Sequence, residues 1–155
     1  MNTQQIDQLL RKDPLTKLYF IGVYAADQLA SLKITKEKWL LVCNCCPSSL
    51  PGQHWIAFFG NDKGEIDFFD SFGLPPNAYR GVPQFLHRRK PEIVRYNAKQ
   101  LQSFESDACG PYCLFFGYLR SRGLTLVEII KETVVVQNSK KRDELITDVV
   151  RNVFY

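Results

Sequence analysis

The segment from Cys109 to Leu119, which reads CGPYCLFFGYL, is apolar and aromatic almost throughout. Proline is favoured at the start of a helix, where its missing N–H costs nothing, so Pro111 predicts that a helix begins here. A helix that is apolar on nearly every side is stable only when most of its surface is buried. We therefore expect a central helix, closed by Gly123, around which the rest of the chain is arranged.

Cys109 would stand at the first turn of this helix. Backbone N–H groups and the positive end of the helix dipole favour an anion at that place. A thiolate so placed has a lowered pKa and is a nucleophile. Nucleophilic catalysis by cysteine also needs a base, a group that orients the base, and donors for the oxyanion.

Length and composition indicate an ordinary globular chain. Its 155 residues predict a single domain covering residues 1–155, and no apolar run approaches the ~18 residues of a membrane span. Five cysteines without a signal-peptide pattern indicate free thiols in a reducing, intracellular compartment. The net charge of +4 permits nucleic acid as a partner without requiring it.

Helical patterns lie at both ends of the chain and strand patterns in the middle. This order predicts an α+β fold, in which helices pack on a mostly antiparallel central sheet. Strand patterns occupy 39–45, 54–59, 65–70 and 93–96, and residues 18–24 form either a strand or a tight packing segment around Gly22. Helical patterns occupy the segment before Pro14, the segment from the capping box Thr125/Glu128 to Val134, and a last helix with the apolar stripe Leu145, Ile146, Val149, Val150 and Val153.

Two of these strands form a predicted hairpin around residues 60–64. If the loop is symmetric about Asp62, His54 faces Asp70 directly, with Cβ atoms about 4.5–5.5 Å apart. Asp67 would face Ala57 on the opposite surface, so the two-residue period selects Asp70 as the partner of His54. The alternative is that His54 begins a strand by chance and that Asp70 only caps a strand end.

The remaining candidates carry less information. Gln102 precedes Cys109 and could supply a side-chain amide to an oxyanion, although most loop glutamines are solvated. His87 lies in a basic stretch and is expected to be a surface residue. A zinc site at Cys43, Cys45 and Cys46 lacks a second ligand pair, so we expect small buried residues and no metal.

Together these residues resemble a known family. The pair His54-Trp55, an acidic residue before Ser71-Phe72-Gly73, and the block from Gln102 to Gly110 resemble the adenovirus maturation proteases, the adenain family of cysteine endopeptidases. The resemblance implies a papain-like site on a circularly rearranged α+β fold. It implies that His54 is the general base, Asp70 its orienting group, Gln102 an oxyanion donor, Cys109 the nucleophile and Trp55 a wall of the site.

Proteases of ubiquitin-like proteins share this order of residues and give the alternative, a deubiquitinase or deSUMOylase. They usually carry Asp before the cysteine and Gln six residues ahead of it, whereas this chain has Ala108 and a seven-residue step. The resemblance thus favours a viral or Polinton-type maturation protease that cleaves capsid precursors in the virion and host nucleus. A non-catalytic binding domain that kept the motif is a further alternative.

The adenoviral relatives are activated by DNA and by a disulfide-linked peptide. This sequence has no cysteine between Gly52 and Leu101, so the candidate activators are DNA and a non-covalently bound peptide, and the sequence itself requires no cofactor. Basic residues that could contact DNA, or could equally form a solvated charged face, are Arg80, Arg88, Arg89, Lys90, Arg95 and Lys99, with Lys140, Lys141 and Arg142 as a second group.

Overall fold

The computed structural model describes all residues from Met1 to Tyr155, and its strands lie close to the predicted segments. In chain order the elements are α1 (Thr3–Lys12), α2 (Thr16–Tyr19), β1 (Phe20–Ala25), the 3-10 helix η1 (Ala26–Ser31), β2 (Trp39–Asn44), β3 (Trp55–Gly60), β4 (Glu65–Phe69), the 3-10 helix η2 (Pro76–Ala78), α3 (Val82–Arg89), β5 (Ile93–Tyr96), α4 (Cys109–Arg120), α5 (Leu126–Val134) and α6 (Ser139–Phe154). None of these helices has both the length and the apolar character needed to cross a membrane.

The five strands form one sheet in the order β1-β2-β3-β4-β5. The central pairs β2–β3 and β3–β4 are antiparallel, but the outer pairs β1–β2 and β4–β5 are parallel. The α+β class is confirmed, whereas the expectation of a mostly antiparallel sheet holds only for its centre. The reason is that η1 lies in the connection from β1 to β2, and η2 and α3 lie in that from β4 to β5. Such crossover connections bring the next strand in parallel.

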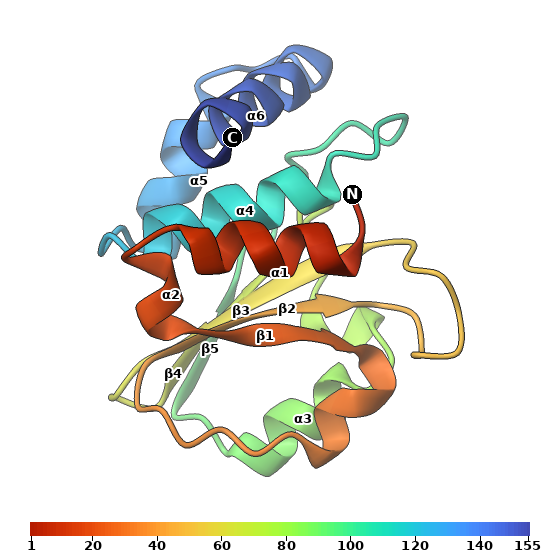
Figure 1. Cartoon of the computed structure of the whole chain (residues 1–155), viewed down its shortest axis with the longest axis vertical. Coiled ribbons are helices and arrows are strands. Elements are labelled where there is room, and N and C mark those ends of the chain that lie inside the picture. The colour runs from red at the N-terminus through yellow and green to blue at the C-terminus, as the bar shows by residue number, and fades with distance from the viewer.

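Helices cover both faces of the sheet (Figure 1). The α1 and α4 helices lie on one face, with α5 and α6 beyond them, and η1 and α3 lie on the other. Two buried clusters result, because alternate residues of each strand point to opposite faces. The first includes Leu40, Phe59 and Phe69, and the second includes Leu41, Phe58 and Phe68.

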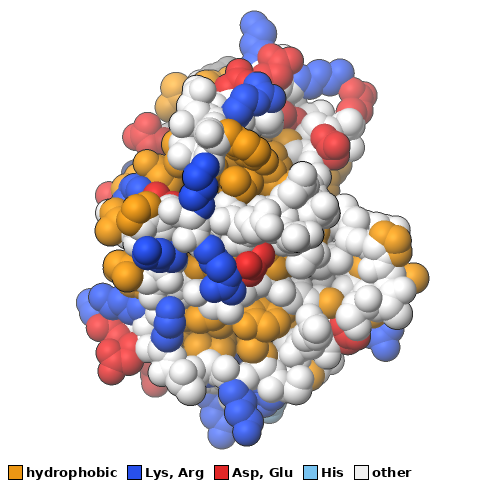
Figure 2. All heavy atoms as spheres, viewed as in Figure 1, with side chains coloured by type: hydrophobic (Ala, Val, Ile, Leu, Met, Phe, Trp, Pro, Cys, Tyr) orange, Lys and Arg blue, Asp and Glu red, His pale blue; other side chains and the backbone are white.

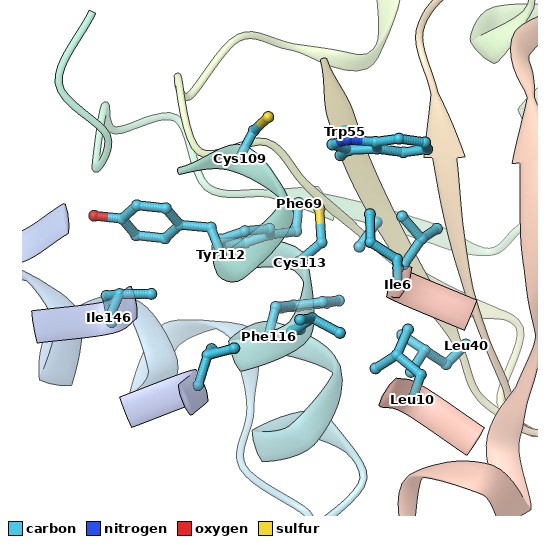
Figure 3. Close-up of a cluster of buried hydrophobic side chains, with 14 of the residues drawn as sticks. Ile6, Leu10, Leu40, Trp55, Phe69, Cys109, Tyr112, Cys113, Phe116 and Ile146 are labelled. Carbon is cyan, nitrogen blue, oxygen red and sulfur yellow. The ribbon is translucent and has the colours of Figure 1, made fainter. Parts of the chain in front are cut away.

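The α4 helix is the central helix that its sequence predicts. Most of its residues are buried, from Cys109 to Gly117 with the exception of Phe115. Figure 3 shows Tyr112 and Phe116 of this helix inside the first cluster, with Cys109 at the end of the cluster where Trp55 lies. Pro111 occupies the third position, still within the first turn, and Gly123 follows the helix at φ +91°. A left-handed glycine is favoured after a helix end.

Two helical details differ from the sequence-based expectation. Residues 82–89 form α3, which begins after the left-handed Gly81 and buries Val82 and Phe85; its short, basic sequence hid these two apolar positions. On α6 the buried stripe is Ile146, Val150 and Phe154, whereas Leu145 and Val153 are exposed. The helix is rotated about its axis relative to the expected stripe, because buried Arg142 donates to the Leu101 carbonyl and buried Asp143 accepts from the Ser103 N–H.

Candidate active site

The hairpin of β3 and β4 brings His54 and Asp70 together, although in a register different from the predicted one. Phe59 pairs with Asp67 and Ala57 with Phe69, so the hairpin is centred on residue 63 rather than on Asp62. The Asn61 carboxamide accepts hydrogen bonds from the N–H groups of Lys63 and Glu65, and this turn displaces the centre. The slip is two residues, which preserves the face of every side chain.

His54 Nε2 lies 2.7 Å from Asp70 Oδ1. Asp70 is completely buried, and a carboxylate can only accept hydrogen bonds, so Nε2 is the donor. Asp70 also accepts from the backbone N–H of Phe72 at 3.1 Å and of Leu74 at 3.0 Å, and from the Tyr79 hydroxyl at 2.7 Å. The carboxylate thus orients the imidazole and, in addition, caps the turn after β4.

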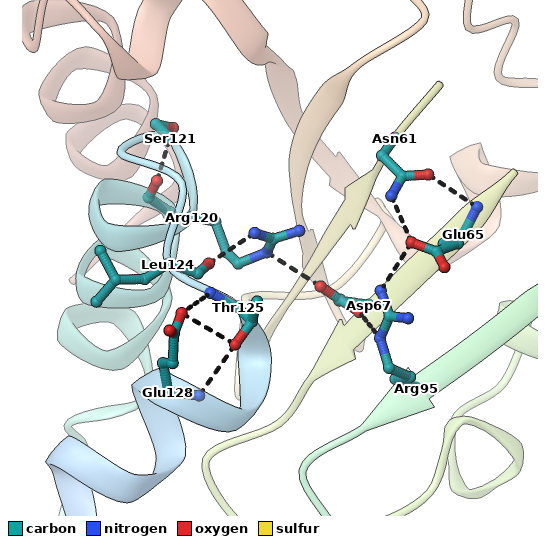
Figure 4. A network of polar contacts seen from close by, with 10 residues as sticks. Asn61, Glu65, Asp67, Arg95, Arg120, Ser121, Leu124, Thr125 and Glu128 are labelled. Atoms are coloured by element: carbon teal, nitrogen blue, oxygen red, sulfur yellow. Dashed lines mark hydrogen bonds and ion pairs between the residues drawn. The ribbon is translucent and has the colours of Figure 1, made fainter. Parts of the chain in front are cut away.

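Asp67 does not contact His54. It lies among cationic side chains, with Arg95 Nε at 2.8 Å and Arg120 Nε at 3.0 Å, as Figure 4 shows. Arg95 also lies 3.3 Å from Glu65. Since Asp67 is buried, its charge needs such partners. This cluster links β4, β5 and α4 away from the candidate nucleophile.

The His54 imidazole is held between Asp70 and Cys109. Burial lowers its pKa, but hydrogen bonding to Asp70 and to Cys109 outweighs burial and raises the pKa to about 9. With Nε2 bound to Asp70, the other ring nitrogen, Nδ1, is the one available to Cys109. Phe72 and Tyr79 stack on the imidazole at ring-centroid distances of 4.8 and 5.9 Å, which restricts its rotation.

The Cys109 thiol lies at the first residue of α4 and is 7% exposed. Burial acts to raise its pKa. Hydrogen bonding from His54 and from the backbone N–H groups of Trp55 and Gly110 overcomes burial, so the pKa lies below the ordinary value. A thiolate–imidazolium pair is the form that such opposite shifts favour.

Gln102 is 1% exposed and its amide is fixed at both ends. The Ser71 hydroxyl donates to Oε1 at 2.6 Å, and Nε2 donates to the Ser106 carbonyl at 2.6 Å. Because a carboxamide has two N–H bonds, the second one remains free to donate. This buried, oriented amide differs from the solvated glutamine that is usual in loops.

The other cysteines differ from Cys109. Burial raises the pKa of Cys43 to about 12, and it also raises the pKa values of Cys45 and Cys113. Cys43 and Cys113 are buried, whereas Cys45 and Cys46 are half-buried. No group of three or more histidine, cysteine or acidic side chains is arranged to hold a metal ion.

Trp55 lies beside the candidate nucleophile. Its indole N–H donates to the Met1 carbonyl at 3.3 Å, and Met1 packs close to Gly110. His87 is exposed, but it lies on α3 rather than in a loop.

Half of the first basic group is engaged within the molecule. Arg88 donates to the carbonyls of Ala30 and Leu32, Arg89 lies over the Trp39 ring, and Arg95 pairs with Asp67. Arg80, Lys90 and Lys99 are exposed, and so is Arg88 despite its contacts with backbone carbonyls. In Figure 2 the Lys and Arg side chains are spread over the visible face among hydrophobic and acidic ones.

The second basic group is also divided. Lys140 and Lys141 are exposed, and Lys140 pairs with Glu105 at 2.6 Å. Arg142 is buried, with its Nε bound to the Leu101 carbonyl at 3.0 Å, so it is not accessible to DNA.

Sequence reasoning missed three residues that support the site. Tyr79 and Ser71 bind the side chains of Asp70 and Gln102, as described above. Asn97 binds the backbone of Asp70, accepting from its N–H at 2.9 Å and donating to its carbonyl at 2.5 Å. Only Ser71 lies in a motif that the sequence singled out, and no local pattern links any of the three to the residue it binds.

The chain is similar in sequence to one cysteine protease. Cysteine protease S273R of African swine fever virus (isolate Tick/Malawi/Lil 20-1/1983) is 27% identical to it over 111 residues, which cover 64% of this chain and 40% of the viral protein. No protein-family model matches the chain.

Solved structures share the fold of this chain. The crystal structure of the African swine fever virus pS273R protease aligns with a TM-score of 0.66 at 18% identity, covering 96% of this chain and 65% of that one. ChlaDub1 of Chlamydia trachomatis aligns with a TM-score of 0.50 at 19% identity, covering 75% of this chain and 58% of that one. The chain therefore spans less than two thirds of each relative. These likenesses confirm an α+β fold of the adenain and SUMO-protease type.

Proposed function

We propose that this chain is a cysteine peptidase. The observation that carries the proposal is the set of contacts among Cys109, His54 and Asp70, in which the thiol has a lowered pKa and the imidazole a raised one. The likeness to the cysteine protease S273R supports it. Gln102 completes the donors and acceptors that acyl transfer needs.

The first half-reaction forms an acyl-enzyme. The Cys109 thiolate attacks the carbonyl carbon of the scissile peptide bond, and a C–S bond forms. The backbone N–H of Cys109 and the free N–H of Gln102 stabilise the oxyanion. The His54 imidazolium then gives a proton to the leaving nitrogen as the C–N bond breaks, and a thioester remains.

The second half-reaction regenerates the thiolate. Neutral His54 takes a proton from water, which attacks the thioester carbonyl. The C–S bond breaks, and the carboxylic acid leaves. Asp70 keeps Nε2 protonated throughout, so the nitrogen that exchanges protons is Nδ1.

The substrates that we propose are capsid precursor proteins of a virus or virus-like element, cleaved during virion maturation in the virion and host nucleus. The viral source of S273R supports this choice. The fold similarity to ChlaDub1 favours the alternative, a ubiquitin-like-protein protease. The two classes differ physically, because the second must bind a folded domain in addition to an extended chain end.

Two measurements test the proposal. Iodoacetamide at neutral pH is expected to alkylate Cys109 faster than Cys43 or Cys113, whose thiols keep their protons. Equal rates, measured by mass spectrometry, would contradict an activated thiol. Cleavage of a capsid-derived peptide is then compared with cleavage of ubiquitin and SUMO C-terminal reporters, using Cys109→Ala as the control. Preference for a reporter with a folded domain would favour the alternative.

DNA or a non-covalent peptide remains the activator that we propose, and no bound cofactor is needed for the chemistry above. The exposed residues Arg80, Lys90 and Lys99 support a DNA contact, whereas buried Arg142 does not. Peptide cleavage measured with and without duplex DNA, from low to high salt, tests this part. An identical rate with and without DNA at low salt would remove it.

A further inference from the structure

Aromatic rings connect the surface of the molecule to the candidate general base. The ring centroids of Phe104 and Phe72 lie 5.7 Å apart with an interplanar angle of 21°, and those of Phe72 and His54 lie 4.8 Å apart with an angle of 24°. Near-parallel rings at these distances form the offset stacks that aromatic side chains prefer. Phe104 is therefore separated from His54 by a single ring.

Phe104 is the most exposed large hydrophobic side chain of the chain, at 77%. Burial of a phenylalanine ring stabilises a folded protein, and here most of that stabilisation is not realised. Unlike Val135, which is exposed to a similar extent, Phe104 stacks on Phe72, which itself stacks on His54.

The loop that carries Phe104 is anchored on both sides of the ring. Gln102 Nε2 donates to the Ser106 carbonyl at 2.6 Å, and the Ser106 N–H donates to the Ser103 carbonyl at 3.2 Å. The Ser103 N–H donates to buried Asp143 at 3.0 Å. These contacts present the ring to solvent from a fixed backbone.

The proposed reaction indicates which part of the substrate meets Phe104. Because His54 protonates the leaving nitrogen, the part of the substrate after the scissile bond must pass His54. Phe72 covers the imidazole, and Phe104 lies two residues after the oxyanion donor Gln102. The exposed Phe104 ring is connected to His54 by stacking through Phe72 and to Gln102 by the chain. It therefore borders the side of the site where the leaving group lies.

We infer that Phe104, backed by Phe72, is a specificity-determining residue that binds an apolar side chain of the substrate directly after the scissile bond. Contact with such a side chain covers the exposed ring and holds the leaving nitrogen near His54. The inference rests on the proposed peptidase function.

The test uses the acyl-enzyme formed from a peptidyl-Gly-aminomethylcoumarin. Leucinamide or glycinamide then competes with water: the amine attacks the thioester, a C–N bond forms, the C–S bond breaks, and the amine proton returns to the site. We expect wild type to prefer leucinamide and Phe104→Ala to lower that preference about tenfold. Phe104→Leu should retain most of it, because the surface stays apolar.

The control is Val135→Ala, since Val135 is 74% exposed and lies at the end of α5; it should leave the acceptor preference at the wild-type value. An unchanged preference in Phe104→Ala would overturn the inference while leaving the peptidase proposal intact. Absence of Cys109-dependent coumarin release in wild type would instead refute the peptidase function, and the inference with it.

Discussion

Replacement of Asp70 by asparagine tests the link between His54 and Cys109. The substitution keeps the size of the side chain and an oxygen that can accept from His54 Nε2. It removes the negative charge, and it puts an NH₂ group where Oδ2 accepts from the Leu74 N–H and the Tyr79 hydroxyl. Because the site is buried, an unsatisfied donor there costs about 1–3 kcal/mol of folding free energy.

The structure gives the size of the electrostatic effect. The rise of the His54 pKa from 6.5 to about 9 corresponds to about 3 kcal/mol in favour of the imidazolium, at about 1.4 kcal/mol for each pH unit. Burial opposes this rise, and Asp70 and Cys109 supply it. Without the Asp70 charge the imidazolium is disfavoured, so the Cys109 thiolate loses its counter-ion and the thiol pKa increases.

The assay is the rate of Cys109 alkylation by iodoacetamide as a function of pH. In Asp70→Asn we expect the acid limb of the profile to move to higher pH by about one unit or more, so that alkylation at pH 6 slows by about tenfold. Asp67→Asn is the matched control. Asp67 lies on β4, three residues before Asp70, and is also buried, but it pairs with Arg95 and Arg120 instead of His54.

The control separates electrostatics from folding. Asp67→Asn should lower the melting temperature without moving the alkylation profile of Cys109. If the profiles of wild type and Asp70→Asn coincide in folded protein, Asp70 does not support the thiolate–imidazolium pair, and the reasoning fails.

Three further predictions concern the site and the fold. Gln102→Ala should reduce kcat for peptide hydrolysis by about 10²–10³ without slowing alkylation of Cys109, and a parallel loss of alkylation would point to misfolding instead. Thermal stability should be greatest between about pH 4 and 6.5. The stabilisation from His54, whose pKa is raised on folding, is complete below pH 6.5 and is lost as pH rises through about 9. The stabilisation from Asp70, whose pKa is lowered on folding, is present above pH 3.8 and is lost as pH falls through the lowered pKa. Asp70→Asn should flatten the melting-temperature profile on both sides. Thr125→Ala removes a capping box on α5 and should cost about 1 kcal/mol in denaturant unfolding, while Thr3→Ala, on α1 capped by Asn2, should cost less.

Local sequence pattern determined most elements of this protein. The run after Cys109 predicted α4 because an all-round apolar helix can only be central, and Thr125 with Glu128 predicted the start of α5 through its capping box. The two-residue period of strands also placed Asp70, rather than Asp67, on the face of His54. That choice survived an error of two residues in the register, because only an odd slip changes the face.

Only the tertiary structure decided the rest. Contacts between separate segments of the chain set four features: the parallel outer strand pairs, the rotation of α6, the Tyr79 contact with Asp70 and the orientation of Gln102 by Ser71. Such contacts depend on how the chain closes in space, and no short-range period records them. The sequence by itself therefore determined the central helix at Cys109 and the face that His54 shares with Asp70, while the fold decided which hydrogen bonds orient these side chains.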